Sequence, residues 1–205
     1  MGKLVLVPTP LGNLEDITLR SLNVLKNCAL VLAEDTRTTG KLFHLLGLSA
    51  PLQSYHMHNE HKVLEKTVER IAQAAGTVAL VTDAGTPGIS DPGFLLVRAC
   101  IGAGIEVETL PGPTAFVPAL VSSGLPSDRF VFEGFLPLSG RDRAERLADI
   151  ASEMRTVIFY EAPHRISRTL NDLAVACHPD RLIAVTRELT KMHEEVWRGS
   201  VSEAA

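Results

Sequence analysis

Short apolar runs alternate with longer amphipathic segments along most of the chain. The apolar runs, each of which predicts a buried strand, are Leu4–Val7, Ala29–Ala33, Val78–Val81, Ile105–Leu110, Arg129–Phe135, Thr156–Tyr160 and Leu182–Thr186. Between them, apolar residues recur at the three- and four-residue spacing of helices. Strands separated by helices of this length favour parallel sheets with helices on both faces. The sequence therefore predicts an α/β fold.

Local signals place several of the expected helix ends. Asp16 and Ser139 precede helical patterns as candidate N-caps, and Gly47 follows one at the C′ position. The second helix should turn Leu42, Phe43, Leu45 and Leu46 inward, and the helix after Ser139 should carry Leu147, Ile150, Ala151 and Met154 on one face. The segment from about Lys191 is polar and shows no clear closing element.

Two α/β domains are expected. Pro111–Pro113 interrupts the pattern, and the segment 124–128 (GLPSD) reads as a linker. We expect an N-terminal domain over residues 1–115 and a C-terminal domain over residues 125–205, with the boundary between about 111 and 127.

Charge and cysteine content narrow the class of protein. The formal net charge of −4 over 205 residues indicates neither nucleic acid nor an anionic membrane as a partner. Cys28, Cys100 and Cys177 lie far apart in apolar surroundings, which predicts buried thiols in a reducing compartment. The run Leu4–Val7 is too short for a signal peptide or a membrane span. These features favour a cytoplasmic protein.

Polar and glycine-rich segments follow most of the predicted strands. They are Pro8–Asn13, Glu34–Arg37, Tyr55–Glu60, Asp83–Gly93, Pro111–Thr114 and Glu161–Arg165. The carboxyl ends of parallel strands meet at one rim of a sheet, where α/β proteins bind ligands. Their joint placement predicts a pocket there.

The loop Asp83–Gly93 is rich in glycine but matches neither a dinucleotide fingerprint nor a P-loop. It carries Asp83 and Asp91 and no Lys or Arg, so it suits a neutral or cationic ligand better than a di- or triphosphate. Asp91 before Pro92 is interpreted as the N-cap of the next helix. Asp83 has no such structural explanation and is the better ligand candidate.

Other polar clusters allow two interpretations each. His56, His58 and His61 with Glu60 lack a partner at zinc spacing, so in place of a metal site we expect a solvated loop or a polar rim loop that touches substrate. Glu34 and Asp35 hold a polar substrate, or Asp35 or Thr36 caps the following helix. Glu161 and His164 handle a proton, or they start a helix, while Arg165 fits a phosphate. The absence of G-x-S-x-G argues against hydrolase chemistry.

The motifs PTPLGNLEDIT, AEDTR, LVTDAGTPGISDPG, LPGPTA, GLPSDRFVFEGFLP and FYEAPHR together resemble the tetrapyrrole methylase superfamily, from about Leu4 to Lys191. Within it, EDTR and EAPHR resemble the branch that acts on ribosomal RNA. The resemblance implies a homodimer of two-domain chains with a ligand cleft between the domains. It also implies S-adenosylmethionine as methyl donor and, as acceptor, the ribose 2′-hydroxyl of a cytidine in 16S rRNA of the 30S subunit.

The resemblance also assigns site residues. Those expected to bind the donor are Pro8, Leu11, Asp83, Gly85, Thr86, Ile89, Ser90, Pro113, Thr114, Ala115 and Tyr160. Those expected to bind the substrate from their place on the rim are Asn13, Glu34, Arg37 and Arg165. Our hypothesis for the catalytic base is Glu161 or His164, with Asp35 behind them.

Two alternative functions remain open. The first is an enzyme of the same superfamily that acts on a porphyrinoid carbon or, like diphthine synthase, on a modified histidine of a translation factor. The second is a non-catalytic module that binds donor or RNA. The second alternative arises because members of the superfamily continue with a Lys-Gly-Glu-led strand and further helices, so we expect the second domain to lack its closing strands here.

Overall fold

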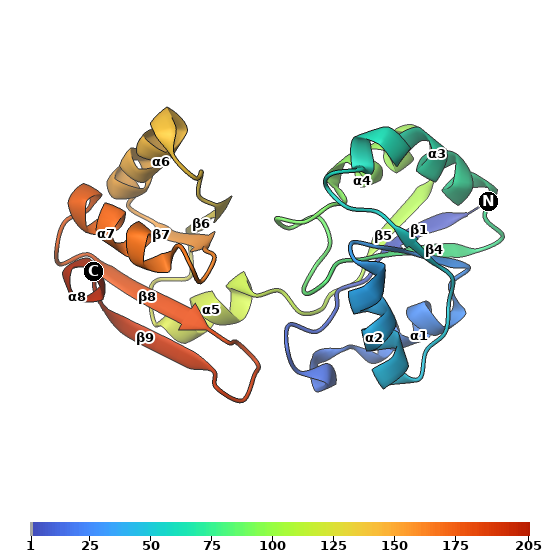
Figure 1. The fold of residues 1–205 in the computed structure, drawn as a ribbon, viewed down its shortest axis with the longest axis horizontal. Coiled ribbons are helices and arrows are strands. Elements are labelled where there is room, and N and C mark those ends of the chain that lie inside the picture. Colours follow the sequence, from blue (N-terminus) through green and yellow to red (C-terminus); the bar gives the residue numbers. More distant parts are fainter. Residues whose placement is uncertain (1) are drawn as a thin grey trace. The chain divides into compact units, whose positions relative to one another are not determined.

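A computed structural model describes residues 2–205. The chain forms two compact units, the first ending at Thr114 and the second spanning Ala115–Ala205 (Figure 1). Each unit has its own sheets and helices.

The first unit contains a five-stranded parallel sheet with the strand order β3-β2-β4-β1-β5. Its strands are β1 (Lys3–Leu6), β2 (Leu30–Ala33), β3 (Leu52–Ser54), β4 (Thr77–Val81) and β5 (Glu106–Thr109). Its helices are the 3₁₀ turn η1 (Leu14–Asp16), α1 (Leu19–Asn27), α2 (Thr36–Leu46), α3 (Glu60–Gln73) and α4 (Phe94–Gly102). Figure 1 shows α3 and α4 on one face of this sheet and α1 and α2 on the other. The predicted parallel α/β architecture is confirmed.

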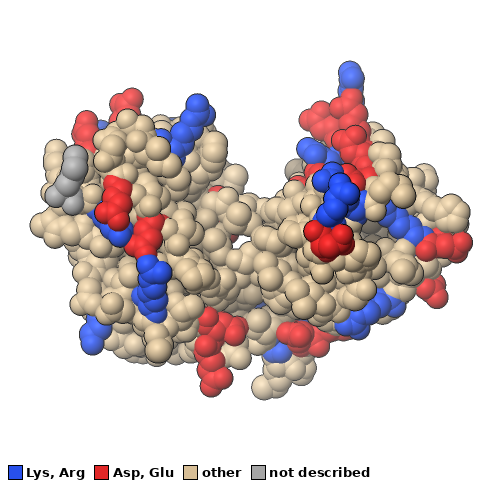
Figure 2. Space-filling view, turned by 180° about the vertical axis from the view of Figure 1, so that it is seen from behind, with Lys and Arg blue, Asp and Glu red and all other residues tan. Residues whose placement is uncertain are grey.

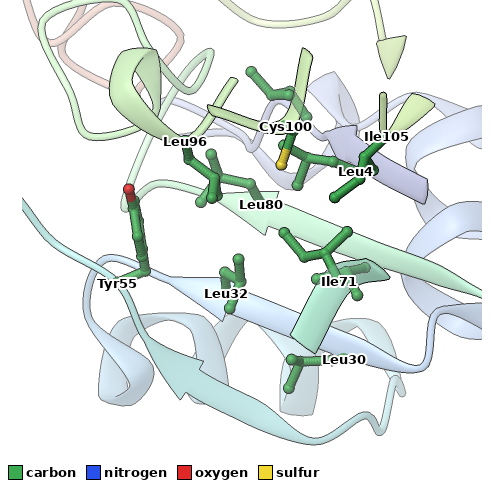
Figure 3. Close-up of a cluster of buried hydrophobic side chains, with 11 residues drawn as sticks. Leu4, Leu30, Leu32, Tyr55, Ile71, Leu80, Leu96, Cys100 and Ile105 are labelled. Atoms are coloured by element: carbon green, nitrogen blue, oxygen red, sulfur yellow. The ribbon is translucent and has the colours of Figure 1, made fainter. Parts of the chain in front are cut away.

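Alternation along the central strands divides the core into two layers. Even-numbered residues such as Leu4, Leu32 and Leu80 pack with Ile71 of α3 and Leu96 of α4 (Figure 3). Odd-numbered residues of the same strands form a second cluster with helices α1 and α2. Successive strand side chains point to opposite faces, so continuous apolar runs are required where both faces are covered.

Three sequence expectations in this unit are wrong. Asp16 ends η1, and the N-cap of α1 is Thr18, whose hydroxyl accepts from the Ser21 N–H at 3.0 Å. Leu45 is 65% exposed rather than inward. Asp91 does not cap α4, because Gly93 (φ 142°) holds the N-cap position. A Cβ at Gly93 would lie 3.1 Å from Leu80 and 3.3 Å from the backbone of Gly88, so close packing fixes this delayed helix start.

The second unit contains two short sheets. Strands β6 (Phe130–Phe135) and β7 (Thr156–Tyr160) pair in parallel, whereas β8 (Leu182–Arg187) and β9 (Glu195–Ser200) pair antiparallel. Its helices are α5 (Phe116–Ser123), α6 (Gly140–Ser152), α7 (Ile166–Ala176) and α8 (Val201–Ala204). The polar segment after Lys191 thus closes with a strand and a short helix, contrary to expectation. Ser200 and Glu203 form a capping box that starts α8.

The core of the second unit is smaller. Leu136, Ile150, Leu173, Cys177 and Val201 are its buried members. Met154 lies beyond the end of α6 and is 96% exposed, which corrects its expected place on the apolar face. The prediction that all three cysteines are buried free thiols is confirmed. Over residues 2–205, no helix is both long and apolar enough to cross a membrane.

Candidate functional site

Three loops meet beyond the carboxyl ends of β1, β4 and β5, which are neighbours in the sheet. Thr9 and Gly85 exchange two backbone hydrogen bonds of 2.9 Å. The Thr86 hydroxyl donates to the Pro113 carbonyl at 2.9 Å, and its oxygen lies 2.5 Å from the Thr114 hydroxyl. A Cβ at Gly112 would stand only 2.7 Å from the Cβ of Pro8. These contacts hold three loop segments together in one rim. They are the segments of the first unit that the family resemblance assigns to donor binding.

Gly85 shapes this rim rather than offering its own polar groups. Both its N–H and its carbonyl are used by Thr9, and its φ of 87° lies in the region that favours glycine. Ser90 also has a positive φ, 61°, which is uncommon for a residue with a side chain. Leu11 packs close to Gly85, where an added Cβ would lie 3.4 Å from Leu11 Cδ2. Ile89 and Ser90 are half-buried in the same loop.

Carboxylates gather beside these loops. Glu34, which follows β2, accepts from the main-chain N–H of Asp83 at 3.3 Å. Burial raises the pKa of Glu34 and of Asp83. Burial, followed by the charges of Glu34 and Asp83, raises the pKa of Asp91 to about 7, and a hydrogen bond with Thr82 opposes that shift. Glu34 and Asp91 are half-buried and Asp83 is exposed. Such an acidic cluster attracts a cation and repels a phosphate.

Asp35 and Arg37 form a local structure at the start of α2. Asp35 is the N-cap, and its Oδ1 accepts from the Arg37 N–H at 2.8 Å. The Arg37 guanidinium also donates to both carboxylate oxygens, at 3.1 and 2.7 Å, and holds the pKa of Asp35 at about 2. The capping interpretation of Asp35 is thus confirmed. Asn13 is exposed and likewise caps η1 by accepting from Glu15.

The histidine loop after β3 is organised by Asn59, whose side chain accepts from the His56 N–H at 2.9 Å. The His56 and His58 rings stand 5.9 Å apart, edge to face. Among residues 2–205, no group of three or more His, Cys, Asp or Glu side chains is arranged to hold a metal ion.

Tyr160, Ala115 and two of the expected catalytic residues, Glu161 and His164, belong to the second unit, whereas Asp35 belongs to the first. Ala115 holds the N-cap position of α5. The ring of Tyr160 contacts Phe132 at 5.1 Å and Phe135 at 5.5 Å between centroids. Phe132 in turn stacks on Phe116 at 4.9 Å. Tyr160 therefore ends β7 within an aromatic cluster.

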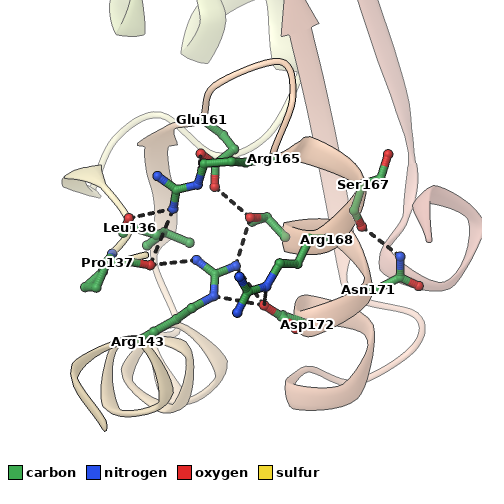
Figure 4. Close-up of polar contacts among 10 residues, drawn as sticks. Leu136, Pro137, Arg143, Glu161, Arg165, Ser167, Arg168, Asn171 and Asp172 are labelled. Carbon is green, nitrogen blue, oxygen red and sulfur yellow. Dashed lines mark hydrogen bonds and ion pairs between the residues drawn. The ribbon is translucent and has the colours of Figure 1, made fainter. Parts of the chain in front are cut away.

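Glu161 and Arg165 form an ion pair inside the second unit (Figure 4). The Glu161 side chain is 3% exposed. Its carboxylate accepts hydrogen bonds from the Thr169 hydroxyl at 2.6 Å and the Ala162 N–H at 2.8 Å, and it forms an ion pair with Arg165 Nε at 3.1 Å. Arg165 Nη2 donates to the Leu136 carbonyl at 2.8 Å. This geometry favours a structural role for both residues over the expected base and phosphate ligand. His164, between them in the chain, is exposed.

A cavity of about 360 Å³ opens elsewhere in the second unit, between β7, β8, α5 and α7. Its lining is mainly apolar, with residues such as Leu120, Phe159 and Ile183. Glu161 reaches it, whereas Tyr160, His164 and Arg165 do not line it. It therefore does not coincide with the expected substrate residues.

Sequence reasoning missed Arg143, which is 4% exposed and lies in the Glu161 network. The signal was available, because Arg143 stands one helical turn before Leu147 on the apolar face of α6.

The distribution of surface charge gives less information about the site. On each unit in Figure 2, acidic and basic side chains are interspersed and most of the visible surface carries neither.

Comparison with known proteins identifies close relatives. The chain is 52% identical over 204 residues to "Ribosomal RNA small subunit methyltransferase I" of Synechocystis sp., covering all of this chain and 73% of that protein. It is 45% identical to the protein of the same name from Thermotoga maritima, covering all of this chain and 90% of the relative.

Solved structures share the fold at lower identity. The methyltransferase CobJ matches with a TM-score of 0.73 and 20% identity, covering all of this chain and 89% of that one. Uroporphyrin-III C-methyltransferase from Thermus thermophilus, complexed with S-adenosylhomocysteine, matches with a TM-score of 0.65 and 19% identity, covering 99% and 90%. The family described as Tetrapyrrole (Corrin/Porphyrin) Methylases matches residues 3–205. The resemblance seen in the motifs is confirmed, and the chain belongs to the tetrapyrrole methylase family.

Proposed function

We propose that this chain is an S-adenosylmethionine-dependent methyltransferase that modifies RNA of the small ribosomal subunit. The observation that carries the proposal is its 45–52% identity, across its whole length, to proteins named for that activity. The acceptor we propose is the ribose 2′-hydroxyl of a cytidine in 16S rRNA. The proposal includes a homodimer and a cytoplasmic location, where 30S subunits are found.

The rim of the first unit fits such a donor in its chemistry. S-adenosylmethionine carries a sulfonium cation and no phosphate, and Glu34 and Asp83 supply negative charge there, to which Asp91 adds as the pH rises through its pKa of about 7. We assign donor binding to Pro8, Leu11 and the Asp83–Ser90 loop, together with Pro113 and Thr114. The contacts of Thr9 with Gly85 and of Thr86 with Pro113 hold these segments in place before the donor arrives. From the second unit, Ala115 and Tyr160 complete the assignment.

When bound, S-adenosylmethionine supplies an electrophilic methyl group. The protein's principal task is then to align the acceptor oxygen with that carbon, and orientation alone supplies about 7–11 kcal/mol in well-aligned reactions. The acceptor hydroxyl must also lose its proton, and a nearby base contributes about 10²–10⁴-fold.

We assign the base to His164. Glu161, the other candidate, already accepts two hydrogen bonds and forms an ion pair with Arg165, on a side chain that is 3% exposed. Asp35 is held by Arg37, which lowers its pKa to about 2 and makes it a weak base. His164 is exposed on the same loop as Glu161. Arg37, whose side chain is 86% exposed, is our candidate for contact with a flanking phosphate.

Transfer of a tritiated methyl group to purified 30S subunits tests the proposal. We expect label in 16S rRNA, at a position that becomes resistant to alkaline hydrolysis because its 2′-oxygen is blocked. His164→Ala should lower kcat by about 10²-fold or more and leave donor binding unchanged. Glu161→Gln, Asp35→Asn and Arg37→Ala would test the remaining assignments.

The alternatives give different results in the same assay. Label in a porphyrinoid or in a translation factor, with none in 30S subunits, would favour the other branches of the family. Donor binding by calorimetry without transfer to any acceptor would favour a binding module.

A further inference from the structure

Arg143 of α6 joins three separate segments of the second unit with one guanidinium group. Its Nε and Nη2 donate to Asp172 Oδ2 of α7 at 2.9 and 2.7 Å. Its Nη1 donates to the Pro137 carbonyl, beyond the end of β6, at 2.9 Å. Its Nη2 also donates to the Thr169 hydroxyl of α7 at 2.9 Å. Arg143 is almost fully buried and its guanidinium group has all these partners, so it forms a buried hydrogen-bond network rather than a surface ion pair.

Thr169 links Arg143 to the loop that follows β7. Its hydroxyl is fully buried, accepts from Arg143 and donates to Glu161 Oε2 at 2.6 Å. The other oxygen of Glu161 takes Arg165 Nε at 3.1 Å, and Arg165 Nη2 donates to the Leu136 carbonyl at 2.8 Å. Arg143 and Arg165 therefore hold the ends of β6 and β7 from two sides.

The network restrains both ends of the loop Glu161–Arg165. The groups that form the network are buried or half-buried, so moving one would leave another without a partner in a poorly solvated place. A fork of donors in fixed geometry serves Asp172, Thr169 and Pro137 at once, which a single ammonium group of lysine cannot do.

We propose that Arg143 is a positioning residue for methyl transfer: through Thr169 and Pro137 it fixes the Glu161–Arg165 loop, and with it the imidazole of His164. Arg143 makes no contact with substrate in this role. The inference rests on the proposed function, because His164 is the base only if that proposal holds.

The experiment compares variants that break the network at two points with controls that do not. Arg143→Lys keeps the charge beside Asp172 but loses the fork. Thr169→Val removes the hydroxyl at nearly constant volume, and Thr169→Ser retains it. Arg181→Lys is the matched control, because Arg181 also donates to main-chain carbonyls, those of Ile150 at 2.6 Å and Glu153 at 2.9 Å, near the start of β7. That end of the strand is about 16 Å from Glu161 at the usual rise per residue.

We expect Arg143→Lys and Thr169→Val to lower kcat on 30S subunits by about 10- to 100-fold, since small misplacements of reacting groups cost that much. The KM for the donor should change by less than about twofold, because the donor rim of the first unit is intact and the ring of Tyr160 keeps its packing on Phe132 and Phe135. Thr169→Ser should restore kcat. Arg181→Lys should lower the melting temperature as much as Arg143→Lys does, while its kcat stays near that of the wild type.

Amide hydrogen exchange supplies a second readout that needs no activity. Exchange in residues 161–165 should rise in Arg143→Lys and Thr169→Val but not in Arg181→Lys. Equal kcat in Arg143→Lys and Arg181→Lys, or unchanged exchange in the loop, overturns the inference. If the wild type transfers no methyl to 30S subunits, the proposed function fails, and hydrogen exchange still decides whether Arg143 fixes the loop.

Discussion

The Thr86 hydroxyl donates a 2.9 Å hydrogen bond to the carbonyl of Pro113, which lies 27 residues further along the chain. The bond joins the loop after β4 to the loop after β5, although β1 separates the two strands in the sheet. Thr86 and Pro113 therefore hold together two of the segments to which we assign the donor.

Thr86→Val should weaken binding of S-adenosylhomocysteine. Loss of a partly buried hydrogen bond costs about 1 kcal/mol. Where this cost falls on the donor-bound protein and not on the free protein, it corresponds to about a fivefold rise in Kd. Calorimetry measures the change directly. Thr67→Val is the control, since the Thr67 hydroxyl is also buried and donates to the Val63 carbonyl at 2.8 Å within α3. Equal Kd values for both variants would contradict the role of Thr86.

Gly112→Ala should disturb the same rim by steric contact. The new Cβ would meet Pro8 Cβ at 2.7 Å and Pro8 Cγ at 3.0 Å, so the two loops must separate. We expect the free energy of unfolding to fall by about 1–3 kcal/mol, as for other overpacked sites, and donor affinity to fall with it. Denaturant titration and calorimetry measure the two effects.

Gly102→Ala provides the comparison for that substitution. Gly102 ends α4 with no heavy atom within 4 Å of an added Cβ. Alanine there should be neutral or stabilising by up to about 1 kcal/mol, because it reduces the entropy of the unfolded chain. If Gly112→Ala is as stable as Gly102→Ala, the loops that carry Pro8 and Gly112 can separate without a measurable cost, which would contradict the expected loss of stability.

The first unit could be predicted well because its central strands are buried on both faces. Val78–Val81 has no polar residue, and its burial requires the continuous apolar run that made it visible. Strand β3, with Gln53 and Ser54, escaped prediction since it lies at the edge of the sheet and is only half-buried. Strand β9 escaped for a similar reason: its polar residues pair with β8 through the backbone, which leaves little trace in the side-chain pattern.

The candidate site was predictable in place but not in detail. The strand-end rule located the loops around Thr9, Gly85 and Pro113, because it depends only on strand direction. The Arg143–Thr169–Glu161 contacts join residues 8 to 26 positions apart and depend on how α6 and α7 pack. Asp91 was misassigned because the N-cap rule is local, whereas the packing of Gly93 against Leu80 is tertiary.

Two of the thiols, Cys28 and Cys100, should react slowly in the native protein. Burial raises the pKa of Cys28 and raises that of Cys100 to about 11, so little thiolate is present at pH 8 and access is limited. We expect a disulfide reagent such as dithionitrobenzoate to label Cys100 at least about 10-fold more slowly than in denaturant, judged by its fraction of thiolate alone. Cys28 should also be labelled more slowly in the folded protein than in denaturant. Mass spectrometry of tryptic peptides resolves the sites. Rapid labelling of Cys100 in the folded protein would contradict its burial.

Asp91 should make stability depend on pH near neutrality. Its pKa is raised to about 7 by burial and by the charges of Glu34 and Asp83, whereas an unfolded Asp titrates near its usual value of 3.8. Between these values the folded state binds the additional proton. The stabilisation is therefore fully present below pH 4 and is lost as pH rises through 7.

Asp91→Asn removes that dependence, since the amide is neutral throughout. At pH 8 the variant should be more stable than the wild type by about 1–2 kcal/mol, a value reduced from the full shift because the carboxyl is partly solvated. At pH 4 the two proteins should be nearly equal. Denaturant titrations at pH 4, 6 and 8 measure the difference, and Asp180→Asn, at a side chain 87% exposed, serves as control. A stability difference that stays constant across this range would show that Asp91 ionises as an ordinary surface carboxylate.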